Sequence, residues 1–277
     1  MDVMAGIKTN NFVVVGRVGM DLFPPNGVAI EDTDSFRADM GGSSANIAAG
    51  IVKLGGQAAL VTRVSDDAVG RFSVKKLHHY DVDTTYVTSV GGEARNSLAL
   101  YESRVAGHQS VIYRNGAADF EMTVADVEAV DYSRFGALVT AGTVFAAEPS
   151  RTAAFRAFEL ARAAGLPIIF DVDYRPYSWP TPQVAADVLS RAGALSDVIV
   201  GNDDEFGFMA GSKAQGLAKA RDLAASTAAI VIYKMGEQAA YDLFKAIRWP
   251  ETDGEAVCPQ CGCVESYDIK SRRKFEC

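Results

Sequence analysis

The chain has 277 residues, 48% of them hydrophobic, and a formal net charge of −8 at pH 7. That length suits one large α/β domain or two smaller ones, and the negative charge argues against nonspecific nucleic-acid binding by the body of the chain. No apolar run of about 18 residues occurs, which excludes a membrane-spanning helix, and residues 1–10 lack a signal-peptide pattern. We therefore expect a cytoplasmic protein without a membrane partner.

Strands and helices are predicted to alternate along the chain. The first strand covers Phe12–Gly16, with Gly19 and Asp21 in a turn after it, and a second strand covers Ala58–Arg63. Four later segments have similar apolar runs: Ala137–Ala141, Pro167–Val172, Val198–Val200 and Ala229–Tyr233. Helices are predicted at Ser150–Ala164, Thr181–Leu195 and Ser212–Ala225. This alternation favours a mostly parallel sheet that is covered on both faces.

Two glycines, Gly41 and Gly42, precede a predicted helix between the first two strands. Ser43 or Ser44 is expected to cap this helix, and Asn46 lies in its first turn. Its apolar residues fall on one face: Ile47, Ile51 and Leu54. Unpaired N–H groups and the helix dipole at such a terminus suit polar or anionic ligands. The alternative is that the glycines only separate a strand from a helix.

The stretch from Asp83 to Arg114 departs from the alternation. Its short β-rich runs are separated by polar gaps: Thr84–Thr88, Ser97–Ser103 and Ser110–Tyr113. Because no helix fits among them, we predict an antiparallel patch.

The order of these motifs resembles the PfkB or ribokinase-like family of carbohydrate kinases: strand, Asp-bearing turn, Gly-Gly-x-x-x-Asn helix, strand, and a Gly-Arg-Phe helix start. The resemblance covers residues 10 to about 241, and is strongest to the 5-dehydro-2-deoxygluconokinases of inositol breakdown, then to 2-keto-3-deoxygluconate kinases. It implies a ribokinase-like three-layer α/β sandwich. It also implies a small β-lid from about residues 17–40 and 84–114, which often pairs with the lid of a second subunit.

The resemblance implies ATP-dependent phosphorylation of a sugar or keto-acid sugar, with magnesium. The implied binders of sugar hydroxyls are Asp21, Gly41, Gly42 and Asn46. Tyr113 and Arg114 resemble a Tyr/Arg pair that grips the carboxylate of the acid sugar, and an arginine fork matches a planar carboxylate. The simpler interpretations are an aspartate that caps a turn and a surface arginine at a strand end.

Polar residues also follow the predicted strands further along. Asp171 and Arg175 match the family's Asp-x-Asn-x-Arg run, with Asp173 in place of the Asn. That replacement keeps an acceptor but loses two donors. Ligands bind beyond the carboxyl ends of parallel strands, so we expect Asp171 and Arg175 in the substrate site.

The nucleotide side is represented by two motifs. Asn202 and Glu205 match the family's Asn-x-x-Glu motif, which helps to organise magnesium and phosphates. A helix cap with acidic first-turn residues is the structural alternative, and both can hold together. Lys234 and Gly236 resemble the family's Lys-x-Gly-x-x-Gly turn near the nucleotide, although Ala239 stands where Gly is usual.

The resemblance stops after Tyr241. The family's Gly-Ala-Gly-Asp motif, which supplies an anion hole and the catalytic aspartate, is absent from this sequence. We therefore assign no catalytic residue and expect residues 1–243 to be an incomplete, C-terminally truncated kinase domain with impaired activity. The alternative is a catalytically dead remnant that still binds sugar.

All four cysteines lie in the tail: Cys258, Cys261, Cys263 and Cys277. Their spacing is that of a zinc ribbon cut off partway, similar to the N-terminal ribbon of certain insertion-sequence transposases. We expect residues 244–277 to be a partial zinc-ribbon-like tail of foreign origin, with at most weak zinc binding by Cys258, Cys261 and Cys277. A disulfide is the rival interpretation, which a cytoplasmic compartment disfavours. A nucleic-acid-binding fusion is a weaker alternative, because the tail has one short basic run.

Overall fold

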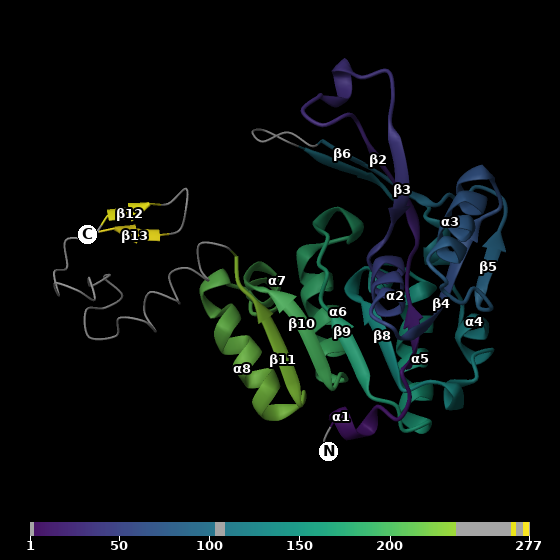
Figure 1. Ribbon diagram of the computed structural model, residues 1–277. Coiled ribbons are helices and arrows are strands. Elements are labelled where there is room, and N and C mark those ends of the chain that lie inside the picture. Colours follow the sequence, from purple (N-terminus) through teal and green to yellow (C-terminus); the bar gives the residue numbers. More distant parts are fainter. Residues whose placement is uncertain (1–2, 103–108, 237–266, 270–273, 277) are drawn as a thin grey trace. The chain divides into compact units, whose positions relative to one another are not determined.

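The computed structural model describes residues 3–102, 109–236, 267–269 and 274–276 (Figure 1). The chain divides into two compact units, Met1–Ile232 and Tyr233–Cys277. Among the described residues, no helix is both long enough and apolar enough to cross a membrane.

A seven-stranded sheet in the order β11-β10-β9-β8-β1-β4-β5 forms the framework. Its strands are β1 (Asn11–Val15), β4 (Gln57–Ser65), β5 (Val87–Val90), β8 (Ala137–Ala141), β9 (Ile168–Asp171), β10 (Val198–Asn202) and β11 (Ile230–Lys234). The pairings from β10 across to β5 are parallel, which confirms the predicted sheet. Val13, Val14 and Val15 are at most 1% exposed, as expected for a strand covered on both faces.

Helices cover both faces of this sheet. The α-helices are α1 (Val3–Gly6), α2 (Ser43–Lys53), α3 (Ala68–His79), α4 (Val124–Glu128), α5 (Ser150–Ala163), α6 (Pro182–Ala194), α7 (Asp203–Met209) and α8 (Gly216–Ser226). Short 3₁₀ turns are η1 (Ile30–Asp32), η2 (Ala118–Glu121), η3 (Tyr132–Arg134), η4 (Gly142–Phe145), η5 (Pro176–Ser178) and η6 (Lys213–Gln215). From β1 through α2 to β4 the chain moves one way along the sheet, and from β8 through α5 to β9 it moves the other way. Because such crossovers are right-handed, α2 and α5 lie on opposite faces.

The core has two halves, one on each face of the sheet. On the face covered by α2 and α3, Ala45 and Leu77 pack with Val14 and Leu60. On the other face, phenylalanine rings lie 4.9–6.0 Å from the ring of Phe145 between centroids: Phe155, Phe158 and Phe170. This packing holds the strands in register, and the polar residues of the candidate site follow their carboxyl ends.

A second sheet, which we call the lid sheet, has the order β3-β2-β6-β7. Its strands are β2 (Gly19–Phe23), β3 (Arg37–Gly41), β6 (Ser97–Tyr101) and β7 (Ser110–Tyr113). β2 pairs antiparallel with β3 and parallel with β6, and β6 pairs antiparallel with β7. Since β1 leads directly into β2, the lid sheet rises from the carboxyl end of the main sheet (Figure 1).

Two expectations about this region are wrong. Gly19 and Asp21 lie in strand β2 and not in a turn, because β3 and β6 pair with both edges of that strand. The predicted strand Thr84–Thr88 falls at β5 and belongs to the main sheet. There it pairs with Thr62–Ser65 at the open edge of β4, whose N–H and C=O groups would otherwise lack partners.

The start of α2 also differs from the prediction. Gly42 occupies the N-cap position, with a φ of 98° and no side-chain cap. Ser43 and Ser44 lie inside the helix, and their hydroxyls contact Thr143 Oγ1 and Val15 O. The side chains that α2 buries are small, including Ala45, Ala48 and Ala49, whereas Leu54 is 90% exposed. Small residues let the helix lie close to the sheet, so the expected Ile47–Ile51–Leu54 face is only partly buried.

The predicted helices at Ser150–Ala164 and Thr181–Leu195 are confirmed as α5 and α6, whereas Ser212–Ala225 is divided between η6 and α8. In the second unit, β12 (Tyr267–Ile269) pairs antiparallel with β13 (Lys274–Glu276). The expected zinc ligands Cys258, Cys261 and Cys277 lie outside the described residues.

Candidate functional site

The site lies where the strand order of the main sheet reverses. β1 and β8 are neighbours, and the chain leaves them toward opposite ends of the sheet. In open α/β sheets such a switch point opens a crevice beyond the carboxyl ends of the strands, where ligands bind. Here β1 leads to Gly16 and Arg17, and β8 leads to Gly142 and Thr143. The lid sheet rises from the same edge.

Asp21 and Gly41 come together at the base of the lid sheet. A Cβ atom added to Gly41 would lie 2.0 Å from Asp21 Oδ1, so only glycine leaves room for this carboxylate. Burial raises the pKa of Asp21 to about 6, Arg17 opposes the rise, and Asp39 on the neighbouring strand adds to it. Burial therefore favours the protonated form of this carboxyl group more than water does.

The N-terminus of α2 lies against the end of β1. A Cβ on Gly42 would lie 2.6 Å from Arg17 O, and the Ala45 N–H donates to that same oxygen at 3.2 Å. Asn46 is exposed in the first turn. With no side chain capping it, the terminus offers N–H groups and a positive dipole end toward the switch point.

Arg114 and Tyr113, expected to act as a pair, point into different surroundings. Tyr113 is 62% exposed, whereas Arg114 is 6% exposed. Arg114 forms an ion pair with Asp119, and its Nη1 donates to Thr143 O at 3.1 Å and Ser178 Oγ at 3.4 Å. Burial lowers the pKa of Arg114, and Asp119 opposes that shift. Arg114 thus joins the end of β7 to the segments that follow β8 and β9.

The end of β9 and the segment after it place Asp171, Asp173 and Arg175 beyond the carboxyl ends of the strands. Asp173 is 5% exposed and adopts a φ of 36°, a left-handed conformation that Asp and Asn tolerate better than most residues. Its Oδ1 forms an ion pair with Arg175 Nη2 at 2.7 Å, and its Oδ2 accepts from Thr143 Oγ1 at 3.4 Å. The carboxylate that replaces the expected amide therefore holds Arg175 in place.

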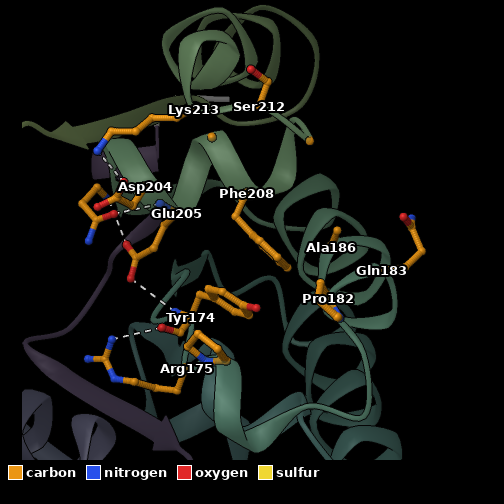
Figure 2. A pocket seen from close by; sticks show the side chains of 14 residues that line it. Tyr174, Arg175, Pro182, Gln183, Ala186, Asp204, Glu205, Phe208, Ser212 and Lys213 are labelled. Carbon is orange, nitrogen blue, oxygen red and sulfur yellow. Dashed lines mark hydrogen bonds and ion pairs between the residues drawn. The ribbon is translucent and has the colours of Figure 1, made fainter. Parts of the chain in front are cut away.

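Asn202 and Glu205 form a reciprocal cap at the start of α7. Asn202 Oδ1 accepts from the Glu205 N–H at 2.8 Å, and Glu205 Oε2 accepts from the Asn202 N–H at 2.8 Å. Glu205 Oε1 also accepts from the Tyr174 N–H at 3.2 Å. The prediction that this motif caps a helix is confirmed. The hydrogen bond to Tyr174 connects the cap to the segment after β9 (Figure 2).

A cavity of about 640 Å³ lies beside this cap, between α6 and α7. Figure 2 shows Tyr174 and Phe208 on its wall, with their rings stacked 3.8 Å apart between centroids. Lys213 lines it as well and pairs with Asp204 at 2.6 Å. The cavity combines aromatic surface with charged groups, which suits a polar molecule with a planar part.

Lys234 and Gly236 belong to the second unit: Lys234 ends β11, and Gly236 follows two residues later.

Three residues important to the site were missed by the sequence reasoning: Arg17, Asp119 and Thr143. Arg17 had a detectable signal, because it follows a buried strand directly. Asp119 and Thr143 had none, since their importance lies in partners that only the fold brings near.

Comparison with known proteins agrees with this geometry. The 5-dehydro-2-deoxygluconokinase of Geobacillus kaustophilus is 36% identical over 205 residues, which is 73% of this chain and 61% of that enzyme. The enzyme of the same name from Clostridium perfringens is 35% identical over 203 residues, which is 73% of this chain and 60% of the relative. This chain therefore spans about three fifths of the length of these relatives.

Solved structures show the same fold. A PfkB protein from Polaromonas has a TM-score of 0.74 at 23% identity, covering 82% of this chain and 76% of that one. The 2-dehydro-3-deoxygluconokinase from Thermotoga maritima has a TM-score of 0.64 at 25% identity, covering 73% and 62%. A family profile described as pfkB family carbohydrate kinase matches residues 9–261, past the expected boundary near residue 243. The chain belongs to the PfkB family of carbohydrate kinases.

Proposed function

We propose that this chain binds a sugar acid beneath its lid sheet and serves the ATP-dependent phosphorylation of that sugar. The observation that carries the proposal is the Asp21 carboxylate, which is held over Gly41 at the switch point beside the open N-terminus of α2. Substrates of the 5-dehydro-2-deoxygluconate or 2-keto-3-deoxygluconate type are suggested by the names of the relatives, and the former would place the chain in inositol breakdown.

In this proposal Asp21, Gly41, Gly42 and Asn46 bind the sugar. Asp21 accepts hydrogen bonds from sugar hydroxyls, while the first N–H groups of α2 donate to sugar oxygens. Arg114 holds the lid strand β7 against the main sheet, and Asp173 orients Arg175. The acceptor hydroxyl is thereby held at the carboxyl edge of the sheet, where phosphoryl transfer depends on positioning and charge stabilisation.

The nucleotide is assigned to the region of Asn202 and Glu205. Lys234 and Gly236, which belong to the second unit, stay a separate prediction of nucleotide binding from their sequence motif. Magnesium prefers oxygen ligands and binds largely through nucleotide phosphates. Among the described residues no group of three or more acidic, His or Cys side chains is placed to hold a metal ion by itself. In this proposal Asn202 and Glu205 help to organise an ion that the ATP phosphates also hold, while Asp171 stays with the substrate. When bound, magnesium would offset charge on the transferred group. Because Gly-Ala-Gly-Asp is absent from the sequence, we propose that transfer by this chain is slow.

The proposal also covers location and assembly. We infer a cytoplasmic protein that forms a homodimer through its lid sheet. Exposed side chains there support the dimer, since Val111 and Tyr113 on β7 are 38% and 62% exposed and large apolar groups favour protein contacts. We also propose that the tail binds zinc weakly. Nucleic acid is not a proposed partner of this chain.

Calorimetric titration of the purified chain with both sugar acids tests the proposal. The Asp21→Asn variant should weaken binding by about tenfold or more, because it removes a charged hydrogen-bond acceptor. Asp34→Asn is the matched control, since Asp34 is exposed in the segment between β2 and β3. Equal affinities for Asp21→Asn and the unaltered chain would refute the assigned site.

A further inference from the structure

We propose that Arg17 is the residue that binds the carboxylate of the sugar acid, and that it makes the site selective for acids over neutral sugars. This inference rests on the proposed function and assigns its substrate class to one side chain. It differs from the expectation placed on Arg114, whose Nη1 and Nη2 groups are already engaged, although its buried Nε lacks a hydrogen-bond partner as that of Arg17 does.

The first observation is that Arg17 is buried without a nearby carboxylate to pair with among the described residues. The residue is 7% exposed; its Nη1 donates to Ser97 Oγ at 3.3 Å, and its buried Nε has no hydrogen-bond partner. In the part of the chain that the structure describes, no carboxylate lies within ion-pairing distance of its guanidinium. A buried cation without an anion is costly. Such a group therefore indicates an anionic ligand.

The second observation is a comparison with the other arginines at the site. Arg114 is buried as deeply but carries its own carboxylate, Asp119. Arg175 pairs with Asp173. Of these three arginines, Arg17 alone has no such partner among the described residues, and its fork of N–H donors matches a carboxylate.

The third observation is where Arg17 lies. It follows β1 at the switch point, and its carbonyl oxygen accepts from the Ala45 N–H in α2. Its charge acts on Asp21 and Tyr101 of the lid sheet and on Tyr177 after β9. The guanidinium is thus within electrostatic range of Asp21 in the proposed sugar site, of the lid sheet and of the segment after β9. The uncapped end of α2 adds a second favourable group for an anion.

The chemistry predicts discrimination as well as affinity. A sugar acid supplies the missing anion and forms charge-assisted hydrogen bonds with Arg17. A neutral sugar leaves the buried donors unmatched, and sites built for a polar group reject ligands that lack it. We expect a preference of about 10- to 100-fold for the acid over its alcohol analogue, from a charged hydrogen bond of ordinary strength.

Calorimetric titration with 2-keto-3-deoxygluconate, and with the analogue bearing CH₂OH in place of its carboxylate, tests the inference. Arg17→Gln should lose about 10- to 100-fold in affinity for the acid and keep its affinity for the analogue. Arg134→Gln is the matched control, because Arg134 is exposed on η3, before β8 begins and so at the opposite edge of the sheet. Equal losses for both ligands, or no loss, would overturn the role of Arg17.

A thermal melt of the ligand-free variants gives an independent readout. Arg17→Met should melt at or above the temperature of the unaltered chain, because it removes an uncompensated buried cation; a clear fall would show a structural role instead and overturn the inference. If the unaltered chain binds the acid but Arg17→Gln binds it equally well, the inference alone fails. If the unaltered chain binds neither ligand, the proposed function fails, and the inference fails with it.

Discussion

Gly41→Ala should disrupt the proposed sugar site through a single methyl group. The added Cβ would lie 2.0 Å from Oδ1 and 2.5 Å from Cγ of Asp21, whereas real Cβ contacts essentially never fall below 3.0 Å. The carboxylate or strand β3 must therefore shift by roughly 1 Å. Overpacking of this kind costs about 1–3 kcal/mol of folding free energy. A displacement of 1 Å in a positioned group costs about 100-fold in function.

The measurements are chemical denaturation and titration with the sugar acids. Gly50→Ala is the matched control, because Gly50 lies in α2 with nothing within 4 Å of an added Cβ. It should stabilise the chain by about 0.5–1 kcal/mol, since alanine favours a helix over glycine. Gly41→Ala should destabilise the chain and weaken sugar binding.

A double-mutant cycle shows whether the clash with Asp21 is the cause. In an Asp21→Ala background the obstructing carboxylate is absent, so Gly41→Ala should cost much less stability than it does alone. Equal costs in the two backgrounds would refute the reasoning and indicate that Gly41 is needed for some other contact.

Three further predictions concern proton, phosphoryl and metal chemistry. Burial raises the pKa of Asp21 to about 6. The contribution of this carboxyl group to the free energy of unfolding therefore decreases as the pH rises from about 4 to 6. Asp21→Asn should remove this pH dependence and raise the melting temperature of the ligand-free chain at pH 7. Sugar-dependent ATP turnover in a coupled assay should be slower than in the relatives named above by roughly 10²–10³ for each electrostatic group of the Gly-Ala-Gly-Asp motif; a normal rate would contradict this. After dialysis against a mild chelator, atomic absorption should find well under one zinc per chain, since Cys258, Cys261 and Cys277 supply fewer than the four thiolates of a closed site.

The main sheet could be predicted from the sequence because its strands are buried on both faces. Continuous apolar runs such as Phe12–Val15 and Ala137–Ala141 stand out in any window. The lid sheet was harder to predict, since its strands are short and mix polar with apolar residues. Whether Asp21 lies in a turn or a strand depends on β3 and β6, which pair with it from distant parts of the chain.

Some residues of the candidate site could likewise be predicted from the sequence, and others could not. Asp21, Gly41 and the start of α2 could be proposed from motif order, and the structure brings them together. The cap formed by Asn202 and Glu205 could be predicted because it is local. The surroundings of Arg114 could not, since its bonds reach Thr143 and Ser178, which follow two different strands.

Three arginines at one sheet edge have different partners, and their partners determine what each can do. Arg114 is buried and joined to Asp119, so removing it would leave a buried carboxylate unpaired. Arg175 is partly exposed and paired with the buried Asp173, so turning it toward a ligand would leave that carboxylate without its cation. Arg17 is buried, and no carboxylate among the residues that the structure describes lies within ion-pairing distance of it, so the ligand-free chain is destabilised by this charge. An arginine that destabilises the ligand-free protein and pairs only with the carboxylate of a ligand makes binding selective for sugar acids. A neutral sugar cannot form this ion pair, so it binds without the free energy that the pair contributes.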